Sequence, residues 1–105
     1  MGTPLTGQQA RERLGRVPGW TLAEDGKAIH REYKMKDFMA AVEMVNRIAR
    51  LAQEQDHHPD IHLTGYRNLR IELSTHDAGG LSEKDFIQAA RINALSVISA
   101  TNETF

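Results

Sequence analysis

The spacing of apolar residues switches repeatedly along this chain between a two-residue and a helical period, and this switching limits the fold more than any other feature. Residues 20–35 and 60–76 alternate apolar and polar side chains, as half-buried β-strands do. Residues 38–53 and 86–98 carry apolar side chains at helical spacing. The chain is therefore expected to form a strand pair, a helix, a second strand pair and a second helix.

Capping residues mark where the helices are expected to begin. Thr6 and Gln9 have the spacing of a capping box, which predicts a short additional helix near the N-terminus. Asp37 precedes the first helical segment and is a favoured N-cap residue. Ser82 and Asp85 have capping-box spacing directly before the last apolar segment, so they predict the start of the final helix.

The two alternating segments are predicted to be β-hairpins. Asp25-Gly26 is a favoured two-residue turn for the first hairpin, and Arg67-Asn68 is expected to join the strands of the second. The element order is then α-β-β-α-β-β-α over a single domain, residues 1–105. This order predicts an α+β fold, a two-layer sandwich in which two long helices cover one face of a four-stranded antiparallel sheet.

Both long helices carry apolar faces that need a partner. In the first, the predicted sheet-facing row consists of Phe38, Val42, Val45, Ala49 and Ala52. The last helix is apolar nearly all round: Phe86, Ile87, Ala89, Ala90, Ile92, Ala94, Leu95, Val97 and Ile98. Because so wide a surface needs cover on two sides, the second side is predicted to contact another subunit.

Composition excludes several classes of function. The net charge is −1, with 13 Lys and Arg against 14 Asp and Glu spread along the chain, so there is no basic stripe for nucleic acid. No apolar run approaches the roughly 20 residues that cross a bilayer. The absence of cysteine excludes disulfides, thiolate nucleophiles and Cys-based zinc sites. A cytosolic protein without nucleic-acid or membrane binding is expected.

Four of the five histidines fall within residues 54–77, and the composition alone does not explain this. The four are His57, His58, His62 and His76. Nearby carboxylates at Asp56, Asp60 and Asp77 keep a metal site open, although the spacing matches no common ligand pattern. Each histidine could also be an ordinary half-exposed residue at the end of an element. Imidazole transfers protons near neutral pH, so a third interpretation is acid–base chemistry on a small molecule.

The histidine region resembles the pterin-4a-carbinolamine dehydratase family. The resemblance rests on "DHHPD", Tyr66 and "STHDAGGLSEKD", with "PGW" and "YKMKDF" upstream, and it covers essentially the whole chain. Two departures stand out. Gln53 occupies a position where the family pattern has a charged residue. The stretch from Pro59 to Tyr66 is one residue longer than in the shortest members, and a β-bulge at Thr64-Gly65 is expected to absorb it.

The resemblance implies dehydration of 4a-hydroxytetrahydropterins to quinonoid dihydropterins, which recycles the cofactor of aromatic amino acid hydroxylases. It implies no metal and no organic cofactor. The implied catalytic residues are His57, His58 and His76, with His57 and His76 as the acid–base pair and His58 holding the pterin. The implied substrate-binding residues also include Asp56, Ser74, Thr75 and Asp77. The implied supporting residues are Pro59, Tyr66 and Asp85. Asp85 is interpreted either as a helix cap or as the partner of a histidine, and the capping-box spacing favours the cap.

The resemblance also leaves two rival functions open. An animal member of the family acts as a dimerisation cofactor of a homeodomain transcription factor, so this chain could be a protein-interaction module. It could alternatively bind pterin with only weak dehydratase activity, because Gln53 lacks the charge of the family pattern. Self-association through the last helix, as a dimer or tetramer, is expected in either case.

Overall fold

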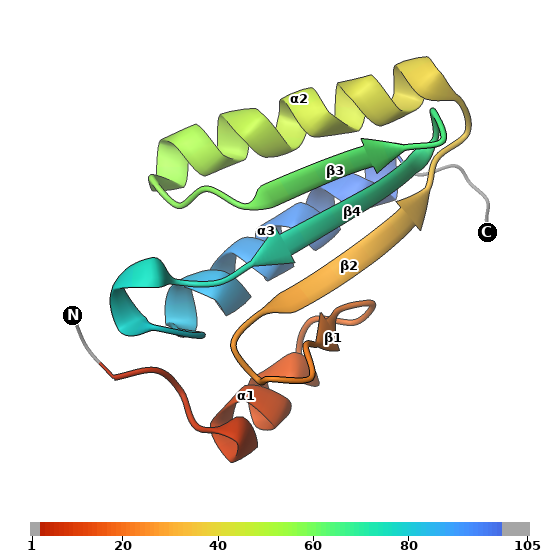
Figure 1. Ribbon diagram of the computed structural model, residues 1–105. Helices are drawn as coiled ribbons and strands as arrows, with labels where there is room; N and C mark the ends of the chain where they lie inside the picture. Colours follow the sequence, from red (N-terminus) through yellow and green to blue (C-terminus); the bar gives the residue numbers. More distant parts are fainter. Residues whose placement is uncertain (1–2, 100–105) are drawn as a thin grey trace.

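The computed structural model describes the backbone of residues 3–99 and the side chains of residues 3–95. The elements are α1 (Gly7–Leu14), β1 (Thr21–Leu22), β2 (Ile29–Lys34), α2 (Phe38–Gln55), β3 (Asp60–Thr64), β4 (Asn68–Leu73), the 3₁₀-helix η1 (His76–Ala78) and α3 (Glu83–Ser99). The strands form one antiparallel sheet in the order β1-β2-β4-β3, and α2 and α3 cover one of its faces (Figure 1). The predicted α+β sandwich is confirmed.

The sheet has one apolar and one polar face, as the alternation in the sequence predicts. The side chains packed in the core are Ile29, Tyr33, Ile61, Leu63, Leu69, Ile71 and Leu73. The other face carries three rows across β2, β4 and β3: His30–Glu72–Asp60, Glu32–Arg70–His62 and Lys34–Asn68–Thr64. Apolar burial on one side therefore fixes the register, because a slip of one residue would turn the charged rows into the core.

The first hairpin is shorter than predicted. Strand β1 has only two residues, and four residues, 24–27, separate the last bonded pair, Ala23 N–H to Ala28 O at 2.8 Å. The pairing is still centred on Asp25-Gly26, as expected. The turn is wider because the Asp25 side chain accepts the Lys27 N–H at 2.9 Å, which takes that amide out of the strand ladder.

The prediction for the second turn was wrong. Strands β3 and β4 pair without interruption up to Thr64 and Asn68, so no bulge interrupts the strand. The turn is made by residues 65–67, and both Gly65 and Tyr66 take left-handed angles, with φ of 53° and 56°. No bulge is needed, because two consecutive left-handed residues can reverse the chain without disturbing the ladder.

Helix α2 begins as predicted but packs through a different row. The Asp37 carboxylate caps it by accepting the Ala40 N–H at 2.8 Å. The buried residues are Ala41, Met44, Ile48 and Ala52, of which only Ala52 belongs to the predicted row. The buried row is thus rotated around the helix relative to the predicted one. Phe38, which was expected in the core, is 50% exposed at the first turn of the helix.

Polar contacts tie the N-terminal segment to α3. The predicted capping box of α1 is present, with bonds from Thr6 N–H to Gln9 and from Gln9 N–H to Thr6. Arg13 at the end of α1 forms an ion pair with Glu83 at the start of α3. The indole N–H of Trp20 donates to Asn93 Oδ1 at 2.8 Å. These contacts hold α1 and the segment after it against the last helix.

Helix α3 buries one side on the sheet. Phe86, Ala89 and Ile92 are buried, whereas Ile87 is 51% exposed. The side chains of Val97 and Ile98, at which a subunit interface was expected, lie outside the described residues, so self-association stays a prediction. Over residues 3–99, no helix has the length and apolar character needed to cross a membrane.

Candidate active site

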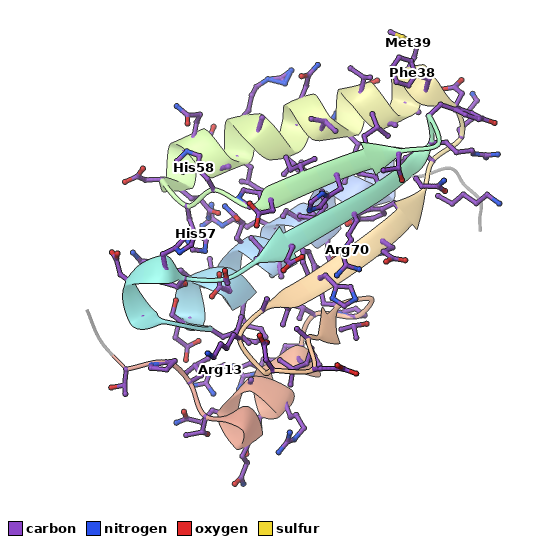
Figure 2. The ribbon with its side chains drawn as sticks, in the orientation of Figure 1. Arg13, Phe38, Met39, His57, His58 and Arg70 are labelled. Atoms are coloured by element: carbon purple, nitrogen blue, oxygen red, sulfur yellow. The ribbon has the colours of Figure 1, made fainter. Side chains whose placement is uncertain are left out.

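The end of α2 directs the two adjacent histidines out of the helix. Asp56 takes left-handed angles, with φ 51° and ψ 44°, and its N–H bonds to the carbonyls of Ala52 and Gln53. The His57 N–H also bonds to the Ala52 carbonyl, at 3.1 Å. This is a Schellman ending, in which one left-handed residue reverses the chain and satisfies the last helical carbonyls. Figure 2 shows His57 and His58 at this end of α2, opposite Phe38 and Met39.

A buried carboxylate from α3 holds the His57 ring. Nε2 of His57 lies 2.7 Å from Oδ1 of Asp85, whose side chain is 0% exposed. The second oxygen of Asp85 accepts the Ser82 N–H at 2.9 Å and the Thr75 hydroxyl at 2.8 Å. Asp85 is therefore both the helix cap and the partner of a histidine. Only half of the predicted capping box forms, because the Asp85 N–H bonds to the Ser82 carbonyl at 3.1 Å and not to the Ser82 hydroxyl.

This contact determines which nitrogen of the neutral His57 ring carries the proton. An ionised carboxylate can only accept hydrogen bonds, so the proton of the neutral ring resides on Nε2, next to Asp85. The Nδ1 atom is then the acceptor. The contact with Asp85 thus fixes the tautomer of the neutral His57 ring.

His58 is held by the residue that departs from the family pattern. Its Nε2 lies 2.8 Å from the side-chain oxygen of Gln53, one turn back on α2. The amide oxygen accepts from the ring as a carboxylate would, but it carries no charge. The His58 side chain remains exposed, and its ring is oriented by a neutral partner.

The second histidine segment follows β4. Thr75 forms an isolated bridge with Gly80, and His76 and Asp77 lie exposed on η1 between them, while Ser74 is half-buried. The Thr75 hydroxyl donates to the same Asp85 that holds His57. Asp85 therefore connects the two segments that the sequence indicated, residues 56–58 and 74–77.

Two residues of the histidine region lie elsewhere. Tyr66 is 60% exposed in the turn after β3, whereas His57 precedes that strand. Five residues of extended strand separate the two ends by roughly 15 Å at about 3.3 Å per residue, so Tyr66 does not support this site within one chain. His62 points to the polar face of the sheet, between Arg70 and solvent. Pro59 is half-buried between His58 and β3, where it prevents the helix from continuing.

The described residues give the metal interpretation no support. Among them, no group of three or more His, Asp and Glu side chains is arranged so that it could hold a metal ion. The carboxylate nearest to His57, Asp85, already accepts three hydrogen bonds from protein groups. Its lone pairs are therefore largely committed to the fold.

A small cavity adjoins His57. It has a volume of about 270 Å³ and is lined by Gln55, His57, Lys84 and Ile87. A larger hollow of about 460 Å³ lies on the polar sheet face, but His62 is its one histidine. Lys84 and Ile87 were not among the site residues predicted from the sequence. Their position on the first turns of α3, flanking Asp85, was the available signal.

Gln88 was also missed. It is 1% exposed on α3, and its amide nitrogen donates to the His57 carbonyl at 2.7 Å and to Gln55 Oε1 at 3.2 Å. A polar residue three positions after Asp85, in an otherwise apolar row, was the signal in the sequence. The sequence alone did not indicate a role for Gln88, because its partner His57 is 31 residues away in the chain.

Comparison with known protein families shows to which family this chain belongs. The profile of the family described as pterin 4 alpha carbinolamine dehydratase matches residues 3–95. The chain belongs to this family. The match includes every candidate site residue from Asp56 to Asp85, so the dehydratase family pattern and the contacts around Asp85 involve the same part of the molecule.

Individual relatives in the dehydratase family agree with this assignment. The chain is 44% identical over 95 residues to the mitochondrial pterin-4-alpha-carbinolamine dehydratase 2 of Arabidopsis thaliana, covering 89% of this chain but 51% of that protein. It is 44% identical over 92 residues to a putative pterin-4-alpha-carbinolamine dehydratase of Halorhodospira halophila, covering 88% and 84%. These relatives are named as dehydratases, which are hydro-lyases.

A solved structure supports the same fold. The transcriptional coactivator/pterin dehydratase from Brucella melitensis superimposes with a TM-score of 0.82 and is 32% identical. The alignment covers 89% of this chain and 98% of that one. The sandwich described above is therefore the dehydratase family fold over nearly its full length.

Proposed function

We propose that this chain dehydrates 4a-hydroxytetrahydropterins to quinonoid dihydropterins by histidine acid–base catalysis. Membership in the dehydratase family supports the substrate class. The observation that carries the mechanism is the 2.7 Å contact between His57 Nε2 and the fully buried Asp85 carboxylate. A histidine whose ring orientation is fixed in this way is well placed to accept or donate a proton.

The proposed reaction is redox-neutral. The bond between C4a and the hydroxyl oxygen breaks, and the hydroxyl group takes up a proton and leaves as water. The lone pair of the adjacent ring nitrogen, N5, forms the new double bond to C4a, and N5 loses its proton. One proton is therefore supplied and one removed, which requires an acid and a base but no metal or organic cofactor.

We assign the base to His57 and the acid to His76. The Nε2 of His57 donates to Asp85, so Nδ1 can accept the N5 proton. His76 lies on η1, on the other segment that Asp85 connects, and its exposed ring can exchange its proton with solvent between turnovers. His58, oriented by Gln53, holds the pterin ring.

The residues around the histidines divide into two groups. Asp56, Ser74 and Asp77 are proposed to bind the pterin edge with hydrogen bonds. The Thr75 hydroxyl already lies within 2.8 Å of both Asp85 and Ser82, so its proposed task is to hold the Asp85 carboxylate in place. Thr75 then acts on the reaction through Asp85 and His57.

The physiological role follows from the substrate class. The proposed role is recycling of the pterin cofactor of aromatic amino acid hydroxylases, in the cytosol. An interaction module remains the alternative, because the Brucella structure is described as a coactivator as well as a dehydratase. A pterin-binding protein with weak dehydratase activity is the other alternative.

The proposal is tested by stopped-flow decay of a 4a-carbinolamine generated in situ. The wild-type protein should accelerate the decay above the spontaneous rate, and His57→Ala should lower kcat by roughly 10²–10⁴, the usual contribution of one acid–base group. His62→Ala is the matched control, since His62 is exposed on the opposite face of the sheet. A wild-type rate equal to the spontaneous rate would refute the proposed function.

A further inference from the structure

Gln88 contacts the backbone of the proposed base from inside the protein. It lies one turn after Asp85 on α3 and is 1% exposed. Its amide nitrogen donates to the His57 carbonyl oxygen at 2.7 Å and to Gln55 Oε1 at 3.2 Å. Both contacts join α3 to the segment that ends α2.

The orientation of the Gln88 amide is fixed by its partner. A backbone carbonyl can only accept, so the amide nitrogen must face His57. This orientation leaves the Gln88 oxygen buried, and within the described residues it has no hydrogen-bond partner. An apolar side chain would avoid this unsatisfied oxygen, but it would also remove the donor to the His57 carbonyl. A glutamine at this position therefore supplies the contacts with His57 and Gln55 while leaving its own oxygen unsatisfied.

His57 is held at three points. Its N–H bonds to the Ala52 carbonyl, its ring to Asp85, and its carbonyl to Gln88. Asp85 and Gln88 are three positions apart on α3, so they lie on one face of the helix. The ring and the backbone of His57 are thus fixed to the same rigid element, which determines where Nδ1 points.

We infer that Gln88 is a positioning residue that, together with Asp85, clamps His57 for proton transfer. The catalytic part of this inference rests on the proposed function. Loss of the Gln88 bond should let the His57 backbone shift while the Asp85 carboxylate stays in place. Small displacements of a reacting group lower the rate strongly, because the productive geometry is populated less often.

The first test replaces the amide with a thioether of the same length. Gln88→Met should lower kcat roughly tenfold, with KM changed less than twofold, because small errors in the placement of a reacting group cost rate. In a His57→Ala background the same change should cause no further loss, since Gln88 would act only through His57. Equal losses in both backgrounds would overturn the inference. Ile92→Val, a buried change on the same helix, controls for lost stability and should leave kcat unchanged.

The second test does not depend on activity. In ¹⁵N-histidine NMR spectra, the wild-type His57 Nε2–H should be protected from exchange by its bond to Asp85. Gln88→Met should speed that exchange and shift the ring signals, whereas Ile92→Val should not. Unchanged His57 signals in Gln88→Met would refute the clamp even in a protein with no dehydratase activity. Should Gln88→Met not fold, Gln88→Leu serves in both experiments.

Discussion

At the scale of single residues, Asp85 makes three hydrogen bonds with two oxygens. One oxygen contacts His57, and the other binds the Ser82 amide and the Thr75 hydroxyl. The spacing of Ser82 and Asp85 predicted the helix cap, because a cap depends on neighbours in sequence. The contact with His57 joins residues 28 positions apart, so only the family resemblance indicated it.

Asp85→Asn should damage both stability and catalysis. An amide offers one oxygen, so whichever way it turns, either the Ser82 N–H or the His57 Nε2–H loses its acceptor. An unsatisfied buried donor costs about 1–3 kcal/mol, which urea unfolding would measure. Stopped-flow kinetics should show kcat reduced at least tenfold, because His57 loses its fixed tautomer. Asp60→Asn, on the exposed sheet face, is the control, and wild-type values for Asp85→Asn would contradict the role of the carboxylate.

At the scale of elements, α2 ends in a strained backbone conformation that turns the following histidines out of the helix. Asp56 occupies the left-handed position at which glycine is the usual residue. A side chain there is strained, and Asp56 is also one of the proposed pterin-binding residues. Residues held in strained conformations are often found at functional sites.

Asp56→Gly should therefore stabilise the protein while reducing its activity. Relief of the left-handed strain should raise the free energy of unfolding by about 1 kcal/mol. Loss of the carboxylate should raise KM for the pterin. Glu54→Gly is the matched control inside the helix, where glycine should lower stability by about 1 kcal/mol. The result that would count against this account is an Asp56→Gly protein less stable than wild type in urea.

The ion pair between α1 and α3 should make stability depend weakly on acid pH. The hydrogen bond from Arg13 lowers the pKa of Glu83 from its ordinary value of 4.5, and the nearby positive charge adds to this effect. The stabilisation is thus fully present above pH 4.5 and is lost as the pH falls through the lowered value. Both groups are solvent-accessible, so the effect should be small and should disappear in high salt.

Glu83→Gln tests this dependence. Melting temperatures measured from pH 3 to pH 7 at low salt should converge between the variant and wild type at the acid end and separate near neutrality. A separation that persists below the lowered pKa, or that is unchanged in molar salt, would show that Arg13 and Glu83 do not interact in this way.

The elements themselves were readable from the sequence, but several details of their packing were not. Strand alternation and the caps at Thr6 and Asp37 are local patterns, and both were confirmed. The turn after β3 depends on two left-handed residues, of which only Gly65 is an obvious candidate. The buried row of α2 is decided by the shape of the sheet below it, which no local pattern contains.

At the scale of the whole molecule, one face of the sheet is apolar and covered by helices, and the other is charged and uncovered (Figure 1). The site lies at the edge of this sandwich, where the end of α2, the segment after β4 and the start of α3 meet at Asp85. A fold with the helices on one side leaves the outer surface of those helices available for further contacts.

The protein is predicted to be a homo-oligomer, a dimer or tetramer, because α3 is apolar beyond the side that it buries. Ile87 is 51% exposed in the single chain. Light scattering at micromolar concentration should give a multiple of the 11.8 kDa chain mass. Ile98→Asp should shift the distribution toward smaller species, since an unpaired buried charge is costly. A wild-type monomer at that concentration would contradict the prediction.

The most direct test of the whole account is the carbinolamine decay rate of five single histidine variants and one double variant at matched concentration. His57→Ala and His76→Ala should each lower kcat by roughly 10²–10⁴, and the double variant should approach the spontaneous rate. His58→Ala should act mainly through KM. His30→Ala and His62→Ala should be nearly neutral. Near-wild-type rates for His57→Ala and His76→Ala, with loss only in His62→Ala, would contradict the assignment of the site.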